Sequence, residues 1–148
     1  MLLWGMDKSY YVSIIDLIFP AEDMEGIMPH DAARLAALGR EWIAAWNAHD
    51  LERVLALYSD DFEMTSDRIP VLGFDASGTL RGKEKVRAYW ALALQRLPNL
   101  HFDLIDLYVS PDSVVVHYAN DRGAKICEYL RVDEAGKIRQ GSANHMVH

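Results

Sequence analysis

Cysteine is nearly absent from this chain of 148 residues, which contains a single thiol, Cys127. One thiol cannot close a disulfide within the chain, and it has no second thiol to complete a thiolate metal site. The sequence therefore fits a reducing compartment without requiring one. Cys127 falls inside an apolar strand pattern, which indicates a packing residue and not a reactive nucleophile.

Basic side chains are outnumbered by acidic ones. The chain has 15 Lys and Arg against 22 Asp and Glu, a formal net charge of −7 at pH 7. It also lacks any run of Lys and Arg interleaved with aromatic residues, so no local basic patch offsets the overall charge. These features argue against a phosphate-binding surface, and we expect no nucleic acid partner.

Long hydrophobic runs are missing as well. The most apolar stretch near the start, "YYVSIIDLIF", is interrupted by Asp16 and is far shorter than the roughly 20 residues that span a bilayer. No net positive segment precedes it and no small-residue cleavage site follows, so it does not read as a signal peptide. We expect no membrane contact and a cytoplasmic location. We interpret residues 1–27 as an N-terminal extension and residues 28–148 as one domain, which begins cleanly with "MPHDAARLAALG".

Metal and nucleotide motifs are absent too. The six histidines show neither HExxH nor a two-His-one-carboxylate spacing, and "GFDASGTLRG" has neither the Rossmann spacing nor a P-loop lysine. We therefore expect no metal and no cofactor, although a metal site assembled from distant strands stays open.

What is present is a clear pattern of three helices. Asp31 is a good N-cap for a helix that runs to about residue 48 with one apolar face, and Asp50 caps a second, shorter helix. A third apolar stripe runs from about Lys83 to Arg96, and Pro98 ends it.

The rest of the chain reads as strands. "DFEMTSD" alternates like a strand after the second helix, and four runs at the C-terminal end are rich in β-branched and aromatic residues: "LHFDLIDLYV", "SVVVHYAN", "AKICEYLRVD" and "KIRQGSANHMVH". Turn-length connectors separate the four runs, which indicates consecutive antiparallel hairpins. Helices followed by strands predict an α+β domain in which helices cover one face of a sheet.

Four segments carry a family resemblance: "WIAAWNAHDLERVLALYSDDFEM", "ASGTLRGKEKVRAYWALALQRLPNLHFDL", "DSVVVHY" and "EYLRVDEAGKIRQGSANH". Over about residues 31–146 the chain resembles the nuclear transport factor 2-like superfamily in its SnoaL-like branch, which also holds ketosteroid isomerases and polyketide cyclases. The resemblance implies a cystatin-like fold, in which a cone-shaped, curved antiparallel sheet wraps around the three helices. It also implies a pocket at the wide end and a homodimer formed through the open sheet face.

The resemblance does not fix a reaction, because the superfamily holds enzymes and binding domains on one backbone. We expect a hydrophobic small-molecule ligand in the pocket and proton transfer without a cofactor, of the isomerase, cyclase or dehydratase type. The alternative is a noncatalytic ligand-binding or interaction module. Trp46 and Trp90 would suit the wall of a pocket for a flat apolar ligand.

Strand alternation selects Glu128 as the main candidate for chemistry. Successive side chains of a strand point to opposite faces, so Glu128 shares a face with Ile126, Leu130 and Val132. A carboxylate on an apolar face is costly to bury unless it is paired or protonated, and its pKa should be raised unless a cation lies beside it. A structural ion pair is the alternative. The same alternation places Tyr118 on the pocket side of its strand and His117 on the outer side.

In the last strand, Asn144 has the parity of Ile138 and His145 lies one step off. A twist or bulge near the rim would turn His145 inward, where it suits a general acid or base, whereas a rim or interface role is the alternative.

The acids after the second helix have two interpretations. Asp60 and Asp61 read as a solvated cap and turn. In ketosteroid isomerases the general base is an aspartate further along the same strand, and counting from "DD" puts that position at Ser66. By that resemblance the base here would be Asp67, or Glu63, or absent, and Tyr58 and Tyr118 would supply hydrogen-bond donors. The candidates are thus catalytic Glu128, Asp67 and His145, and ligand-binding Trp46, Tyr58, Glu63, Trp90, Tyr118 and Asn144.

Overall fold

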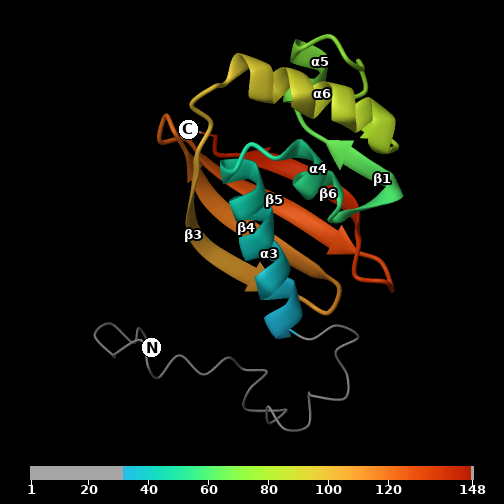
Figure 1. Ribbon diagram of the computed structural model, residues 1–148, viewed down its shortest axis with the longest axis vertical. Coiled ribbons are helices and arrows are strands. Elements are labelled where there is room, and N and C mark those ends of the chain that lie inside the picture. The colour runs from blue at the N-terminus through green and yellow to red at the C-terminus, as the bar shows by residue number, and fades with distance from the viewer. Residues whose placement is uncertain (1–31, 148) are drawn as a thin grey trace, which may run out of the picture.

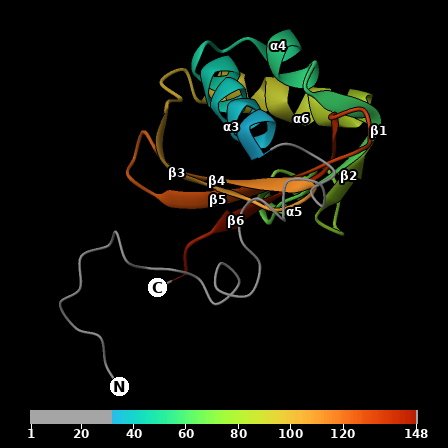
Figure 2. The same ribbon diagram turned by 90° about the horizontal axis from the view of Figure 1, so that it is seen from below.

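The computed structural model describes residues 32–147. The expected N-terminal extension, its boundary at Met28 and the cap at Asp31 lie outside this range. Within it, helices α3, α4 and α6 cover one face of a six-stranded sheet (Figures 1 and 2). This is the α+β arrangement that the order of elements predicts, and the sheet is curved and does not close on itself.

The helical hairpin forms as the sequence predicts. Helix α3 spans Ala32–Asn47 and buries its Leu35, Trp42 and Trp46 face against the sheet. Helix α4 spans Leu51–Leu55, and the Asp50 carboxylate caps it by accepting a hydrogen bond from the backbone N–H of Arg53 at 3.0 Å. Since only three residues separate the two helices, α4 turns back against α3.

Helix α6 spans Lys83–Arg96, the range that its apolar stripe predicts. Gly82 precedes it with φ 86°, a backbone conformation that a residue with a Cβ atom rarely adopts. Val86, Tyr89 and Trp90 form its buried face. The face points toward β1 and the interior of the sheet.

The six strands occur in the order β2-β1-β6-β5-β4-β3. Their bounds are β1 Tyr58–Thr65, β2 Thr79–Arg81, β3 Phe102–Val109, β4 Ser113–Asn120, β5 Lys125–Val132 and β6 Ile138–His145. Strands β3 to β6 are joined as consecutive antiparallel hairpins, as expected. The sheet is antiparallel except where β1 pairs in parallel with β6. That parallel pairing joins the first and the last strand of the chain.

Two details around β1 differ from the sequence expectation. Asp60 and Asp61 are exposed to solvent, as the solvated interpretation holds, but they belong to β1 and do not form a turn. The strand therefore begins at Tyr58, three residues ahead of the "DFEMTSD" run that the sequence indicates as a strand. The loop that follows contains the short helix α5, Arg68–Val71, before β2.

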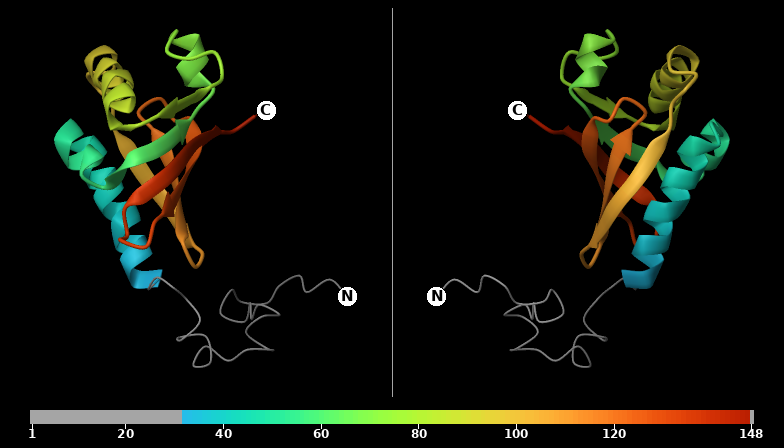
Figure 3. Two further views of the ribbon diagram at one scale, coloured as in Figure 1. Left: turned by 90° about the vertical axis from the view of Figure 1, so that its right-hand side faces the viewer. Right: turned by 90° about the vertical axis from the view of Figure 1, so that its left-hand side faces the viewer.

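The sheet and helices pack closely at Gly39 of α3. A Cβ atom at this position would lie 2.7 Å from Cδ2 of Leu107 on β3 and 3.3 Å from Cγ2 of Val116 on β4. The missing side chain thus lets α3 approach the sheet. The opposite face of the sheet carries no helix within residues 32–147, apart from α5 at its end (Figure 3).

Candidate functional site

A cavity of about 670 Å³ opens between the sheet and α6. The elements that line it, α5, α6 and the neighbouring ends of β4, β5 and β6, lie at the end of the molecule away from the first turn of α3 (Figure 1). Its wall is largely apolar and includes aromatic residues from α3, α6, β3 and β4: Trp42, Trp46, Tyr89, Trp90, Phe102 and Tyr118. Such a wall suits a flat apolar ligand.

Glu128 lies on the sheet side of this cavity. Its residue is 3% exposed, on the face that it shares with buried Ile126, Leu130 and Val132, so the predicted burial is confirmed. Burial raises the pKa of Glu128 to about 8, although hydrogen bonding with the Tyr118 hydroxyl works in the opposite direction. No cation contributes to that shift. At neutral pH the side chain is therefore mostly a carboxylic acid, which can donate a hydrogen bond or a proton.

Two tyrosines lie close to the acid. Tyr118 on β4 lines the cavity, and burial together with the charged form of Glu128 raises its pKa far above the ordinary range. Tyr58 is 1% exposed and does not line the cavity. Its hydroxyl accepts a hydrogen bond from Nε1 of Trp42 at 2.8 Å, and burial raises its pKa too. Both phenols therefore stay protonated over the physiological range.

His145 faces the cavity because β6 contains a bulge. Ile138 pairs with Val132, but Gln140 already pairs with Arg131, so Arg139 is an extra residue on β6. This shift exchanges the two faces for the rest of the strand. Ala143 and His145 consequently face inward, opposite Glu128 and Ile126. The expectation that a bulge turns His145 inward is confirmed, although the bulge lies at the start of β6 and not near the rim.

His145 is paired with Asp67. Nδ1 of His145 lies 3.1 Å from a carboxylate oxygen of Asp67, the residue that precedes α5. An Nδ1–H group that donates to this carboxylate leaves Nε2 as a proton acceptor. Asp67 itself is exposed and is not part of the cavity wall. Asp67 is connected to the site by its contact with His145.

The sheet register brings the acid, the phenol and the histidine together. Tyr118 and His145 both pair with Ile126, from the strands on either side of β5, and Glu128 is two residues further along β5. Residues in this diagonal relation across an antiparallel pair lie about 7–8 Å apart, within reach of a common ligand. Three polar groups from three adjacent strands thus face one point of an apolar cavity.

Sequence reasoning did not select two further polar residues of the wall. Ser66 is 3% exposed and its hydroxyl accepts a hydrogen bond from the backbone N–H of Arg68. Tyr89 on α6 has a raised pKa because of burial, while a hydrogen bond with Ser66 lowers it. The signal for Ser66 was available, since the family count from "DD" ends on this position. Tyr89 looked like an ordinary member of the apolar stripe of its helix.

Besides Asp67, three predicted site residues lie outside the cavity wall. Glu63 and Asn144 are on the outer face of the sheet, where Glu63 pairs with Arg81 and the Asn144 amide donates to the backbone carbonyl of Cys127. The bulge in β6 removes Asn144 from the face of Ile138, which had suggested it. Tyr58 belongs to the packed core beneath the cavity. Of the nine candidates, the structure places Glu128, Tyr118, His145, Trp46 and Trp90 in the cavity wall.

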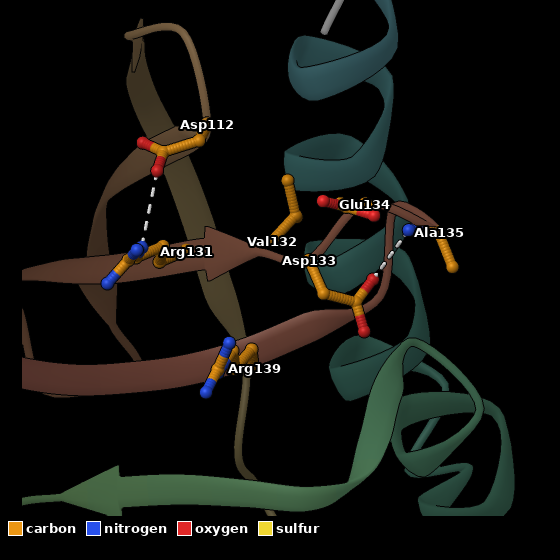
Figure 4. A pocket seen from close by; sticks show the side chains of 7 residues that line it. All are labelled: Asp112, Arg131, Val132, Asp133, Glu134, Ala135 and Arg139. Carbon is orange, nitrogen blue, oxygen red and sulfur yellow. Dashed lines mark hydrogen bonds and ion pairs between the residues drawn. The ribbon is translucent and has the colours of Figure 1, made fainter. Parts of the chain in front are cut away.

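A second hollow lies near the turn between β5 and β6 (Figure 4). Its side chains include Asp112 and Arg131, which form an ion pair at 3.2 Å, and Asp133, whose carboxylate accepts the Ala135 backbone N–H. These charged groups are solvated or paired with each other. The hollow therefore lacks the buried acid that distinguishes the aromatic cavity.

Residues 32–147 offer neither a metal-binding cluster nor a membrane-spanning helix. No cluster of three or more His, Cys, Asp or Glu side chains there is arranged to hold a metal ion. None of the helices in that range combines the length and the apolar composition needed to cross a membrane.

Comparison with known proteins identifies the family of this chain. The model of the SnoaL-like domain matches residues 39–140. A SnoaL-like protein of unknown function from Burkholderia thailandensis E264 is 39% identical, with a TM-score of 0.75 over 79% of this chain and 98% of that one. No curated protein matches the chain.

More distant solved structures share the fold. An NTF2-like protein of unknown function from Burkholderia pseudomallei K96243 is 20% identical, with a TM-score of 0.60 over 76% of this chain and 91% of that one. A protein proposed to be an isomerase of the SnoaL-like family, from Agrobacterium tumefaciens C58, is 14% identical, with a TM-score of 0.63 over 78% and 99%. With its curved sheet, covering helices and this match over most of its length, the chain belongs to the SnoaL-like domain family.

Proposed function

We propose that this domain binds a hydrophobic small molecule in the aromatic cavity and moves a proton on it without a cofactor, as an isomerase, cyclase or dehydratase does. The observation that carries the proposal is the buried, neutral Glu128 on the wall of a 670 Å³ aromatic cavity. Strongly shifted acids in apolar cavities are typical of sites that do acid-base chemistry. We place this activity in the cytoplasm.

Glu128 would act as the acid. Its protonated carboxyl can donate to a carbonyl oxygen of the ligand and stabilise the negative charge that develops there when a neighbouring carbon loses its proton. Tyr118, which also keeps its proton, provides a second O–H in the same wall. Ketosteroid isomerases likewise use a carboxylic acid that stays neutral as a hydrogen-bond donor.

His145 would act as the base. Its Nε2 can accept the proton from the carbon next to the carbonyl, while Asp67 holds the ring and stabilises the imidazolium that forms. If the imidazolium returns that proton to another carbon, the result is an isomerisation. If it gives the proton to a hydroxyl group of the ligand, that group leaves as water and the result is a dehydration. The proton count is balanced in both cases, and no redox partner is required.

In the noncatalytic alternative, the domain binds the ligand but transfers no proton. In that case Glu128 and Tyr118 only recognise a polar atom of the ligand. The distant structural likeness to a protein proposed to be an isomerase supports the fold and leaves this choice open. The two functions differ in whether bound ligands exchange protons.

A two-step experiment tests the proposal. A thermal-shift screen of steroids, polyketide-like aromatics and lactones identifies ligands, since a ligand at 100 times its Kd adds about 2.7 kcal/mol of stability. Proton exchange at the carbons next to the carbonyl of each ligand is then followed by NMR in deuterated water. We expect exchange with the native protein and a loss of about 10²-fold to 10⁴-fold in the His145→Gln and Glu128→Gln variants.

The controls separate the two functions. Glu63→Gln changes a glutamate on the outer face and should leave exchange unchanged. Ligands that bind with no exchange above the uncatalysed rate would establish the noncatalytic module. The absence of any apolar ligand would contradict both versions.

A further inference from the structure

The mouth of the aromatic cavity is rimmed by arginines. Arg68 at the start of α5, Arg96 at the end of α6 and Arg122 in the turn between β4 and β5 belong to three different elements, and all three line the opening. Opposing charges at the same rim are Asp121, which lines it, and Asp67, 3.7 Å from Arg68. At the mouth of the cavity, arginines thus outnumber carboxylates, although the whole chain has a formal net charge of −7.

Two of these arginines are free to bind a ligand. Some arginines of the chain are engaged with carboxylates, as Arg53 is with Glu41 and Arg131 with Asp112. Arg96 and Arg122 form no ion pair within 4.0 Å with any residue from 32 to 147. Both side chains are exposed to solvent, so they can reorient toward a bound group. Guanidinium groups match the geometry of carboxylates in particular.

The inner part of the cavity offers the opposite chemistry. It holds a neutral acid, Glu128, with the Tyr118 hydroxyl beside it in the same wall. Both groups can donate a hydrogen bond to an acceptor atom of a ligand. This part of the site therefore favours an uncharged hydrogen-bond acceptor such as a carbonyl and disfavours a buried negative charge.

We propose that the ligand is a rigid, apolar carboxylate: a ring body held by the aromatic wall, a carbonyl oxygen directed to Glu128, and an acidic group held at the mouth by Arg96 and Arg122. This inference rests on the proposed ligand-binding function and names its substrate class. The arginines at the mouth also steer such an anion toward a protein that otherwise repels it. The acidic group stays in water, where its charge costs little.

Matched probes test both ends of the ligand. The parent probe is a biphenyl with an acetyl group at one end and a carboxylate at the other. One analogue replaces the carboxylate with a carboxamide, and a second replaces the acetyl group with ethyl. Binding is followed by titration calorimetry at low and at high salt. We expect the parent to bind about threefold to tenfold more tightly than the carboxamide at low salt, since exposed ion pairs are individually weak.

The same titrations include two variants. The doubly substituted Arg96→Gln, Arg122→Gln protein should lose the preference for the carboxylate and keep its affinity for the carboxamide. Arg139→Gln, an exposed arginine beside the second hollow (Figure 4), should behave like the native protein. The ethyl analogue should bind about threefold to tenfold more weakly than the parent if its carbonyl is accepted inside.

Each other outcome overturns something definite. Equal affinities for carboxylate and carboxamide, or a preference that survives in the double variant, overturn the role of the arginines and leave the proposed binding function intact. Equal affinities for the acetyl and ethyl probes overturn the inner acceptor site. If none of the three probes binds, this inference fails, and a negative thermal-shift screen alongside it would remove the proposed function as well.

Discussion

At the scale of single residues, the protonation of Glu128 is tied to the stability of the fold. The unfolded chain has an ordinary glutamic acid pKa of about 4.3, whereas the folded chain holds it at about 8. Between these two values the folded state keeps a proton that the unfolded state has lost. The free energy of unfolding therefore falls as the pH rises through this window, and this contribution levels off above pH 8.

Glu128→Gln should remove this dependence, because glutamine has the volume of the protonated acid and does not titrate. We expect the variant to gain stability relative to the native protein by about 1.4 kcal/mol per pH unit between roughly pH 5 and 8. Urea unfolding at several pH values measures the difference. Glu134→Gln, an exposed glutamate, is the matched control and should show no such trend. A constant difference between Glu128→Gln and the native protein would mean that the acid is not buried in its neutral form.

At the scale of elements, the contact of α3 with the sheet depends on Gly39. The space at this position is occupied by Leu107 and Val116, so a larger side chain must move one of them or the helix. We expect Gly39→Val to lower the free energy of unfolding by about 1–3 kcal/mol through overpacking. Ala37→Val, on the exposed side of the same helix, controls for the lower helix propensity of valine and should cost well under 1 kcal/mol. Equal losses in the two variants would show that α3 does not approach the sheet at Gly39.

At the scale of the whole molecule, we propose that the outer face of the sheet forms a homodimer. Tyr108, Val115 and Tyr129 are paired across three adjacent strands on this face, and no helix in the described part of the chain covers them (Figure 3). Tyr108 is 55% exposed. Aromatic residues gathered on a sheet face commonly mark a contact surface.

Sedimentation at tens of micromolar protein tests the dimer. We expect a dimer for the native chain and for Tyr129→Phe, and a monomer for Tyr129→Glu, which places a charge in the middle of the proposed contact. Circular dichroism checks that the glutamate variant is folded. A native monomer at this concentration would contradict the proposal.

The sequence by itself determined the elements and part of the site. Apolar spacing of three and four residues located α3 and α6, and alternation of period two placed Glu128 among buried neighbours. These patterns are local, so they survive without knowledge of the fold. The family resemblance added the layout of sheet and helices.

Only the tertiary structure decided the rest of the site. The extra residue Arg139 exchanges the two faces of β6, and nothing in "KIRQGSANH" marks where the pairing with β5 shifts. Asp67 meets His145 because β1 runs beside β6, which joins segments that lie more than seventy residues apart in the chain. Register and long-range pairing arise from the summed packing of the whole sheet. For that reason the sequence placed Glu128 and Tyr118 on the pocket side, whereas the cause of the inward turn of His145 and its contact with Asp67 appeared only in the structure.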